Sequence, residues 1–177
     1  MSTPASDSAR ADTDPAPPDL KTRIARLAAV IGGEDFSNGD RAVLKRWAPR
    51  QPVPLAFYRL WLRHIDDNLP SERATPRWML LAWGLALVGR GAHRPERSLG
   101  QALAESRFAD TRLERLLDAP EDVLPDLFMG AVRFLASQDA AFDWFDAARL
   151  LLAREPDKRE SARRSIATRY YRHLPKE

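Results

Sequence analysis

The arginines between residues 97 and 115 are the side chains of this sequence whose type and spacing suggest chemistry. Arg112 and Arg115 are three residues apart, so on a helix they are neighbours, and they lie off the leucine face of that helix. Arg97 and Arg107 precede them. A guanidinium group is always charged and its planar fork fits phosphate oxygens, which suggests a phosphate-binding edge. A solvated basic edge on a core-facing helix pair fits the local pattern equally well.

Two short helices joined by a tight break must position these arginines, in the stretch that reads SLGQALAESRFADTRLERLLDA. Ser98 is expected to cap the first helix, with Gln101 reaching back to the cap. Thr111 and Glu114 are expected to repeat that arrangement in the second helix, with Asp110 as a competing cap.

This stretch resembles the "SLGRALA…R…ERR" segment of the CasB family, the small subunit of the type I-E CRISPR effector complex called Cascade. Further segments agree in the same order: NGDRAVLKRW at 38–47, AFYRL at 56–60, and FDWFDAARLLL at 142–152 followed by a basic run from Lys158. Each segment is short, but four in the right order are more specific than one. The sequence departs from the family pattern at Gln101, where a basic residue is common.

The resemblance implies a non-catalytic subunit, usually present as two copies, that helps to hold the RNA–DNA hybrid and the displaced strand. Its partners would be the guide RNA, the target DNA, other Cascade subunits and a second copy of itself, with no cofactor. The sequence offers no matched set of side chains for base edges, so we expect salt-sensitive, sequence-independent contacts to the nucleic-acid backbone. The predicted nucleic-acid-binding residues are Lys45, Arg46, Arg97, Arg107, Arg112, Arg115, Lys158, Arg159 and Arg163.

Composition limits the class of protein. The chain has 177 residues, no cysteine and a net charge of +3, which excludes disulfides and cysteine-bound zinc. The first twenty residues hold one arginine and four aspartates, so the remainder carries 27 basic and 21 acidic residues, a moderate excess of 6. Residues 1–18 lack large aliphatic side chains after Met1 and are predicted to be a disordered acidic tail. A single α-helical nucleic-acid-binding domain is predicted over residues 19–175.

Apolar residues recur at helical rather than alternating spacing, so we predict an all-α fold, a compact bundle of about eight or nine helices without a sheet. Residues 76–89 are apolar on nearly every side and should form the central helix, with Gly84 allowing a neighbour to approach closely. Val43 is expected to face inward after a turn at 37–39, and residues 90–97 to form a basic, mobile loop. The longest charge-free apolar run, Trp78–Gly89, is too short to span a bilayer, which favours a cytoplasmic protein.

The sequence contains none of the common catalytic motifs. The histidines His64, His93 and His173 are scattered, and there is neither a phosphate-binding loop nor a serine in a nucleophile elbow. We therefore predict that the protein is not an enzyme. Two alternatives to the Cascade subunit stay open, a helix-turn-helix regulator built on residues 98–118 and a helical scaffold that binds protein.

Deletion of residues 1–18 is expected to leave helicity and melting temperature unchanged, because this acidic segment has no apolar anchors. Circular dichroism of the full chain and the truncated chain measures both quantities. A substantial fall in melting temperature on truncation would show that the tail packs on the domain.

Overall fold

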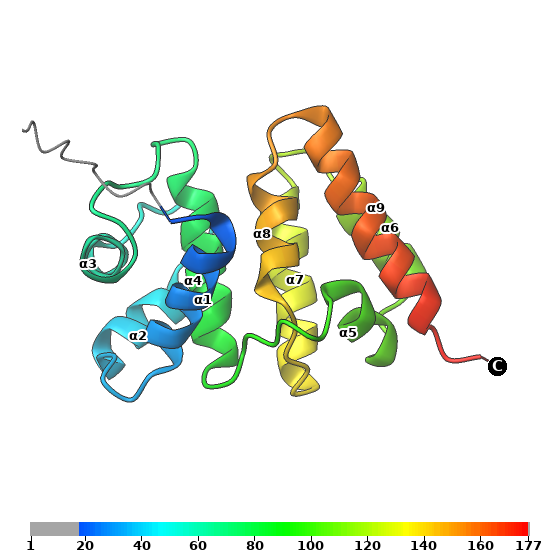
Figure 1. The fold of residues 1–177 in the computed structure, drawn as a ribbon, viewed down its shortest axis with the longest axis horizontal. Coiled ribbons are helices and arrows are strands. Elements are labelled where there is room, and N and C mark those ends of the chain that lie inside the picture. The colour runs from blue at the N-terminus through cyan, green and yellow to red at the C-terminus, as the bar shows by residue number, and fades with distance from the viewer. Residues whose placement is uncertain (1–17, 177) are drawn as a thin grey trace, which may run out of the picture.

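The computed structural model describes residues 18–176, which form nine α-helices and no strand (Figure 1). The helices are α1 (Leu20–Gly32), α2 (Asn38–Arg46), α3 (Leu55–His64), α4 (Thr75–Val88), α5 (Leu99–Glu105), α6 (Asp110–Leu117), α7 (Leu124–Ser137), α8 (Trp144–Leu152) and α9 (Pro156–His173). The predicted all-α class is confirmed. The predicted tail lies outside the described residues, apart from Pro18.

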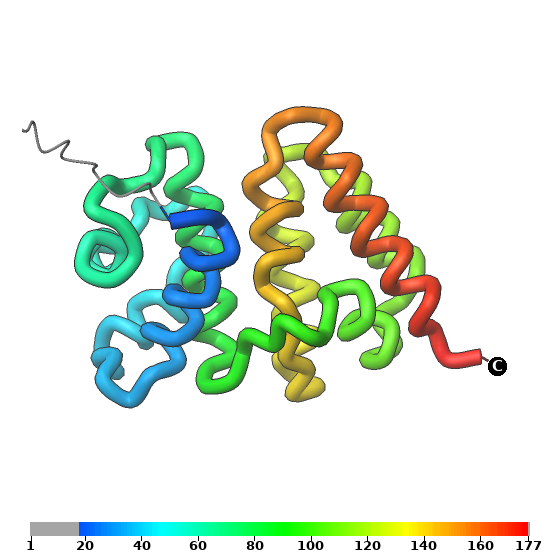
Figure 2. The backbone as a smooth tube through the Cα atoms, viewed as in Figure 1, coloured from blue at the N-terminus to red at the C-terminus, as the bar shows by residue number. Residues whose placement is uncertain are grey.

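The backbone path in Figure 2 divides the molecule into two ends joined by a central pair of helices. Helices α1 to α4 form one end, α5, α6 and α9 form the other, and α7 and α8 lie between them. None of the described helices is long and apolar enough to cross a bilayer.

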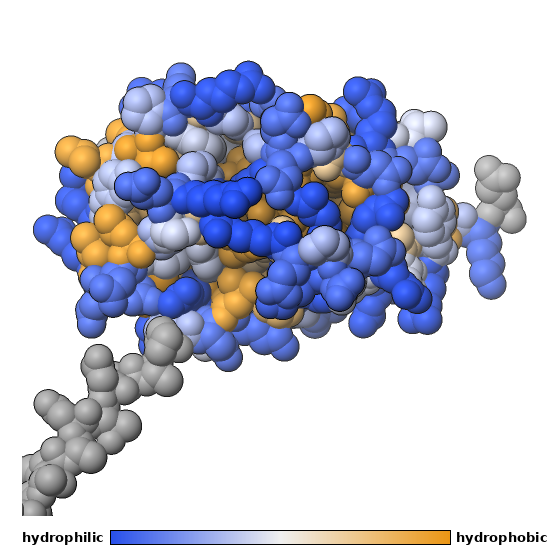
Figure 3. Space-filling view, turned by 90° about the horizontal axis from the view of Figure 1, so that it is seen from above, coloured by the Kyte–Doolittle hydropathy of each residue, from blue (hydrophilic) through white to orange (hydrophobic). Residues whose placement is uncertain are grey.

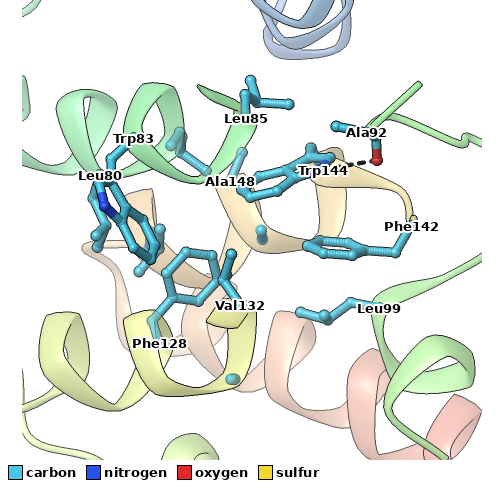
Figure 4. Packing of buried hydrophobic residues seen from close by; sticks show 14 of the residues in the cluster. Leu80, Trp83, Leu85, Ala92, Leu99, Phe128, Val132, Phe142, Trp144 and Ala148 are labelled. Atoms are coloured by element: carbon cyan, nitrogen blue, oxygen red, sulfur yellow. Dashed lines mark hydrogen bonds between the residues drawn. The ribbon is translucent and has the colours of Figure 1, made fainter. Parts of the chain in front are cut away.

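Helix α4 is the centre of the core, as its sequence predicts. Ten of its fourteen residues are buried, so it has no side that favours water. It packs against α1, α2, α7 and α8, which cover it all round. Trp83 of α4 lies beside Phe128 of α7 and is 1% exposed (Figure 4).

Two glycines bring helices into close contact. A Cβ added at Gly84 would lie 2.3 Å from the ring of Trp144, so the expected close approach at Gly84 is made by the first residue of α8. The Trp144 indole N–H in turn donates to the backbone oxygen of Ala92, at 3.1 Å (Figure 4). At the other end, Gly100 of α5 lies directly against the backbone of α9 at Ile166.

Several local expectations are wrong at helix starts. Ser37 caps α2, so the expected turn is the first turn of that helix, and Val43 is 36% exposed. Ser98 does cap α5, but the Gln101 side chain donates to Glu105 instead of reaching back to the cap. Thr111 lies inside α6, whose N-cap is Ala109 without a side-chain hydrogen bond.

Hydrogen bonds fix the segment between α4 and α5 to the residues that precede α8. Its backbone exchanges hydrogen bonds with Phe142 and Asp143, including Arg94 N–H to the Phe142 oxygen at 2.9 Å and Asp143 N–H to the Arg97 oxygen at 2.7 Å. His93 Nδ1 accepts from the backbone N–H of Trp144, at 3.1 Å. These bonds hold the segment against the start of α8. The basic side chains of residues 90–97 suggest a mobile loop and do not indicate these backbone contacts.

Substitution of Gly100 by alanine is expected to destabilise the protein. The new Cβ would lie 2.2 Å from the backbone oxygen of Ile166, so α5 and α9 must move apart, and overpacking of this kind costs about 1–3 kcal/mol or more. Gly130→Ala in α7 is the matched control, because nothing lies within 4 Å of its added Cβ. Urea unfolding of both variants measures the difference, and equal stabilities would contradict the close packing of α5 on α9.

Acidification is expected to weaken the fold through His93. Burial lowers the pKa of His93 below its usual value of 6.5, with Asp143 and Glu96 opposing the shift. The unfolded chain therefore binds more protons below about pH 6.5, so the free energy of unfolding falls as the pH drops through the pKa of the folded state. A glutamine at this position can still accept from Trp144 and does not titrate.

Urea unfolding at pH 7.5 and 5.5 compares the chain with its His93→Gln variant. The unsubstituted protein should lose more stability between these two pH values than the variant does. An identical pH dependence of both proteins would show that His93 does not contribute.

Candidate nucleic-acid interface

Helix α6 presents the two arginines that its sequence pattern predicts. Leu113 and Leu116 are 1% exposed and face α7, whereas Arg112 and Arg115 are exposed. Neither arginine forms an ion pair with a residue of the described chain. Their charge is therefore available to a ligand.

The turn before α6 fixes where this edge lies. Arg107 adopts a left-handed backbone conformation with φ of 59°, which reverses the chain after α5. Phe108 is then buried, and its N–H donates to the Leu103 oxygen at 2.9 Å. The hydroxyl of Tyr170 on α9 donates to the Phe108 oxygen, at 2.5 Å. Arg107 itself stays exposed at the corner.

Arg112 stacks on two aromatic rings. Its guanidinium carbon lies 5.2 Å from the ring centroid of Phe108 and 6.0 Å from that of Phe134, and the two rings are 5.3 Å apart. Stacking of this kind orients the guanidinium plane and leaves its N–H edge able to donate. Arg112 thus has two aromatic contacts that a fully solvated arginine lacks.

A groove of about 150 Å³ runs between α6 and α7, lined in part by Arg112, Arg115 and Asp126. Asp126 also accepts from Arg50, at 2.9 Å, so an arginine of the loop after α2 contacts one of the residues that line the groove. Sequence reasoning missed Arg50, since it lies in a proline-rich break with a φ of 74° and no periodic pattern. The groove therefore holds two arginines without an ion pair among the described residues, and one carboxylate that pairs with Arg50.

Lys45 and Arg46 lie at the last turn of α2, exposed and without an ion pair among residues 18–176. Helices α2 and α6 are labelled at opposite ends of the molecule in Figure 1. The structure therefore does not join the two groups in one cluster. Arg50, in the loop after α2, pairs with Asp126 of α7. This pair connects the loop after α2 to the helix that borders the α6–α7 groove.

The other predicted arginines and the lysine are held by carboxylates. Arg97 donates to Glu105 at 2.6 Å and to the Ala141 oxygen at 3.1 Å. On α9, Lys158 pairs with Glu155 at 3.3 Å and Arg159 with Glu121 at 2.6 Å.

Arg163 bonds the Leu117 oxygen and pairs with Asp118 and Glu160. Arg159 and Arg163 thus bind α9 to the connection between α6 and α7. Of the nine predicted residues, four pair with carboxylates and five form no ion pair within the described chain.

Among the exposed arginines that the prediction omitted are one on α7 and one on α9. Arg133 of α7 stacks on Trp83, at 5.4 Å from the ring centroid, and Arg164 of α9 is exposed without an ion pair among the described residues. Arg133 is a polar position in the largely apolar pattern of α7, and this pattern could have identified it. Tyr171 is half exposed, and its hydroxyl bonds Asp110, which raises the pKa of Tyr171 to about 12. That bond links α9 to the start of α6, which gives Tyr171 a structural role.

These features define a class of protein: an all-α domain whose exposed arginines sit on rigid helices, where no three histidine, aspartate or glutamate side chains of residues 18–176 are placed to hold a metal. The family model for CRISPR-associated protein Cse2 matches residues 40–171. The chain therefore belongs to the Cse2 family, also called CasB, of the type I-E Cascade complex, and the predicted family is confirmed. Searches of curated proteins and of solved structures returned no match.

Proposed function

We propose that this chain is a non-catalytic small subunit of Cascade that binds the sugar-phosphate backbone of guide RNA and target DNA and stabilises the R-loop in antiviral defence. The observation that carries the proposal is the α6–α7 groove, where Arg112 and Arg115 are exposed and Arg112 is oriented by two aromatic rings. Arginine forks on rigid helices suit phosphate oxygens, which are the same at every base pair. The binding would then be independent of sequence.

The free energy of R-loop formation explains why a few contacts to the backbone can matter. The RNA–DNA hybrid that forms in an R-loop is about as stable as the DNA duplex it replaces. A few backbone contacts can therefore shift the balance toward the open state, while pairing with the guide reads the sequence. Each phosphate that an arginine neutralises also releases counterions, so the affinity should fall as salt rises.

The nine predicted residues should contribute unequally. Lys45, Arg46, Arg107, Arg112 and Arg115 can bind phosphate without breaking an ion pair of the described chain. Four others must first break an ion pair with a carboxylate, and they should add less to the affinity for nucleic acid: Arg97, Lys158, Arg159 and Arg163. We infer that Arg50 can also bind phosphate readily. Both side chains of the Arg50–Asp126 pair are exposed, and an exposed ion pair costs little to break.

The remaining parts of the proposal rest on family membership. The chain associates with other Cascade components, and we propose that it does so beside a second copy of itself, in the cytoplasm and without a cofactor. The helix-turn-helix alternative is not favoured by the packing. Helix α5 packs chiefly on α9 and α6 packs on α7, whereas a helix-turn-helix pairs its two helices with each other.

Reversal of both groove arginines, Arg112→Glu with Arg115→Glu, is expected to weaken binding to every DNA or RNA sequence by a similar factor. If each arginine covers one phosphate of a duplex, the slope of log affinity against log salt should become shallower by about 2 units. The fold should survive, because exposed charges and an exposed cation–π contact contribute only about 1 kcal/mol. Fluorescence anisotropy over a series of salt concentrations, beside circular dichroism, measures both effects.

The matched control is Arg26→Glu with Arg63→Glu, which changes the net charge equally on two exposed arginines of α1 and α3, at the opposite end of the molecule (Figure 1). It should keep the salt slope of the unsubstituted protein. Lys45→Glu with Arg46→Glu tests whether α2 contributes. Unchanged affinity and slope in the folded α6 variant would exclude the groove, and a loss confined to one sequence would favour a regulator.

A further inference from the structure

A second group of arginines surrounds a cavity where several helix ends meet. The cavity has a volume of about 330 Å³, and its charged lining consists of Arg73, Arg77, Arg154, Arg159, Glu121 and Asp122. We call it the arginine cavity. Figure 3 looks onto the end of the molecule at which α7 and α9 begin, and hydrophilic side chains crowd the middle of that face with hydrophobic surface visible between them.

Glu121 already occupies the position of an anion among these arginines. Its carboxylate accepts from Arg159 at 2.6 Å and lies 3.9 Å from a terminal nitrogen of Arg73. Its backbone oxygen accepts from Arg77 Nη2 at 2.6 Å. The arrangement of guanidinium groups around one carboxylate shows that this cavity can hold negative charge.

Arg77 and Arg154 have hydrogen-bonding capacity that the carboxylate does not use. The Nη1 atom of Arg77 is buried and makes no hydrogen bond within residues 18–176, although a buried guanidinium nitrogen is costly to leave unpaired. Burial lowers the pKa of Arg77, as expected for a charge that is only partly compensated. Among residues 18–176, Arg154 donates only to the Ser71 hydroxyl, at 3.2 Å.

The backbone adds to this positive environment. Ala74 and Arg77 belong to the start of α4, Glu121 and Asp122 directly precede α7, and Arg159 lies in the first turn of α9. Three helices therefore direct the positive ends of their dipoles at the cavity, and α8 alone of the helices that line it ends there. The four arginines and two carboxylates leave a net charge of +2.

We propose that the arginine cavity binds a phosphate group. Its net charge matches a phosphate monoester, which carries about −1.5 to −2 at pH 7. Its volume of about 330 Å³ is far above the space that one water needs, so a phosphate group fits inside. The phosphate comes either from a nucleic-acid strand or from a free nucleotide. The inference goes beyond the backbone contacts of α6, since apart from Arg159 the residues of this cavity are not among the predicted site residues.

Titration with inorganic phosphate at constant ionic strength, with chloride as the exchanged anion, tests the site. Phosphate should raise the melting temperature of the full chain more than chloride does. Arg73→Ala with Arg154→Ala removes two exposed arginines of the cavity and should weaken phosphate binding, measured by calorimetry, by about tenfold or more. Arg26→Ala with Arg63→Ala, also exposed but not among the residues that line the cavity, should bind phosphate as the unsubstituted protein does.

Glu121→Gln gives a prediction of opposite sign. Removal of the competing carboxylate should increase the affinity for phosphate several-fold, whereas a purely structural Glu121 would leave it unchanged. Equal stabilisation by phosphate and chloride, or equal phosphate affinity in the Arg73/Arg154 variant, would overturn the proposal.

Competition identifies the source of the phosphate. A single-stranded oligonucleotide that displaces inorganic phosphate supports a nucleic-acid strand, and displacement by a nucleoside monophosphate but not by the oligonucleotide supports a free nucleotide. The Arg112/Arg115 variant should keep its phosphate binding at the cavity, because neither residue lines it. Failure of this site is thereby distinguishable from failure of the α6 groove.

Discussion

Helix α4 has no polar side, and the rest of the structure depends on covering it. Burial of a single large apolar side chain from water contributes about 1.5–3 kcal/mol, so an apolar helix with ten buried residues must be surrounded on all sides. Helices α1, α2, α7 and α8 do so, and each presents one apolar face to the core. Their charged faces are consequently turned outward. The basic surface is the outer side of an arrangement whose inner side is dictated by hydrophobic burial.

The arginines of that surface divide into two kinds, according to whether a carboxylate lies within reach. Arg163, which bonds the Leu117 oxygen and Asp118, orients α9 on the neighbouring connection. Arg112 meets aromatic rings instead, which orient the guanidinium without neutralising it. An exposed ion pair contributes little to stability, but it occupies the donors that a phosphate would need. Equal charge in the sequence therefore does not mean equal availability to a ligand.

The folded domain is larger than the segment that matches the family. The Cse2 model covers residues 40–171 and so includes the α6–α7 groove and the arginine cavity. Helix α1 lies before the matched segment, yet Ile24, Leu27 and Ile31 are fully buried in the same core. A fragment cut at residue 40 would expose the surface of α4 that α1 covers, because the two helices pack directly against each other. The basic surfaces thus rely on a helix that the family match does not include.

The sequence by itself determined the all-α class, the central helix, the outward direction of Arg112 and Arg115, and the family. The first three follow from local periodicity, since an apolar residue every three or four positions sets which side of a helix is buried. The family came from the resemblance of four short segments in the right order. The tertiary structure alone decided that Arg97 and Arg159 pair with carboxylates, that Arg50 pairs with Asp126 of the α6–α7 groove, and that the arginine cavity exists. Those contacts join residues 8 to 76 positions apart, and their geometry depends on how helices pack rather than on the pattern within any one of them.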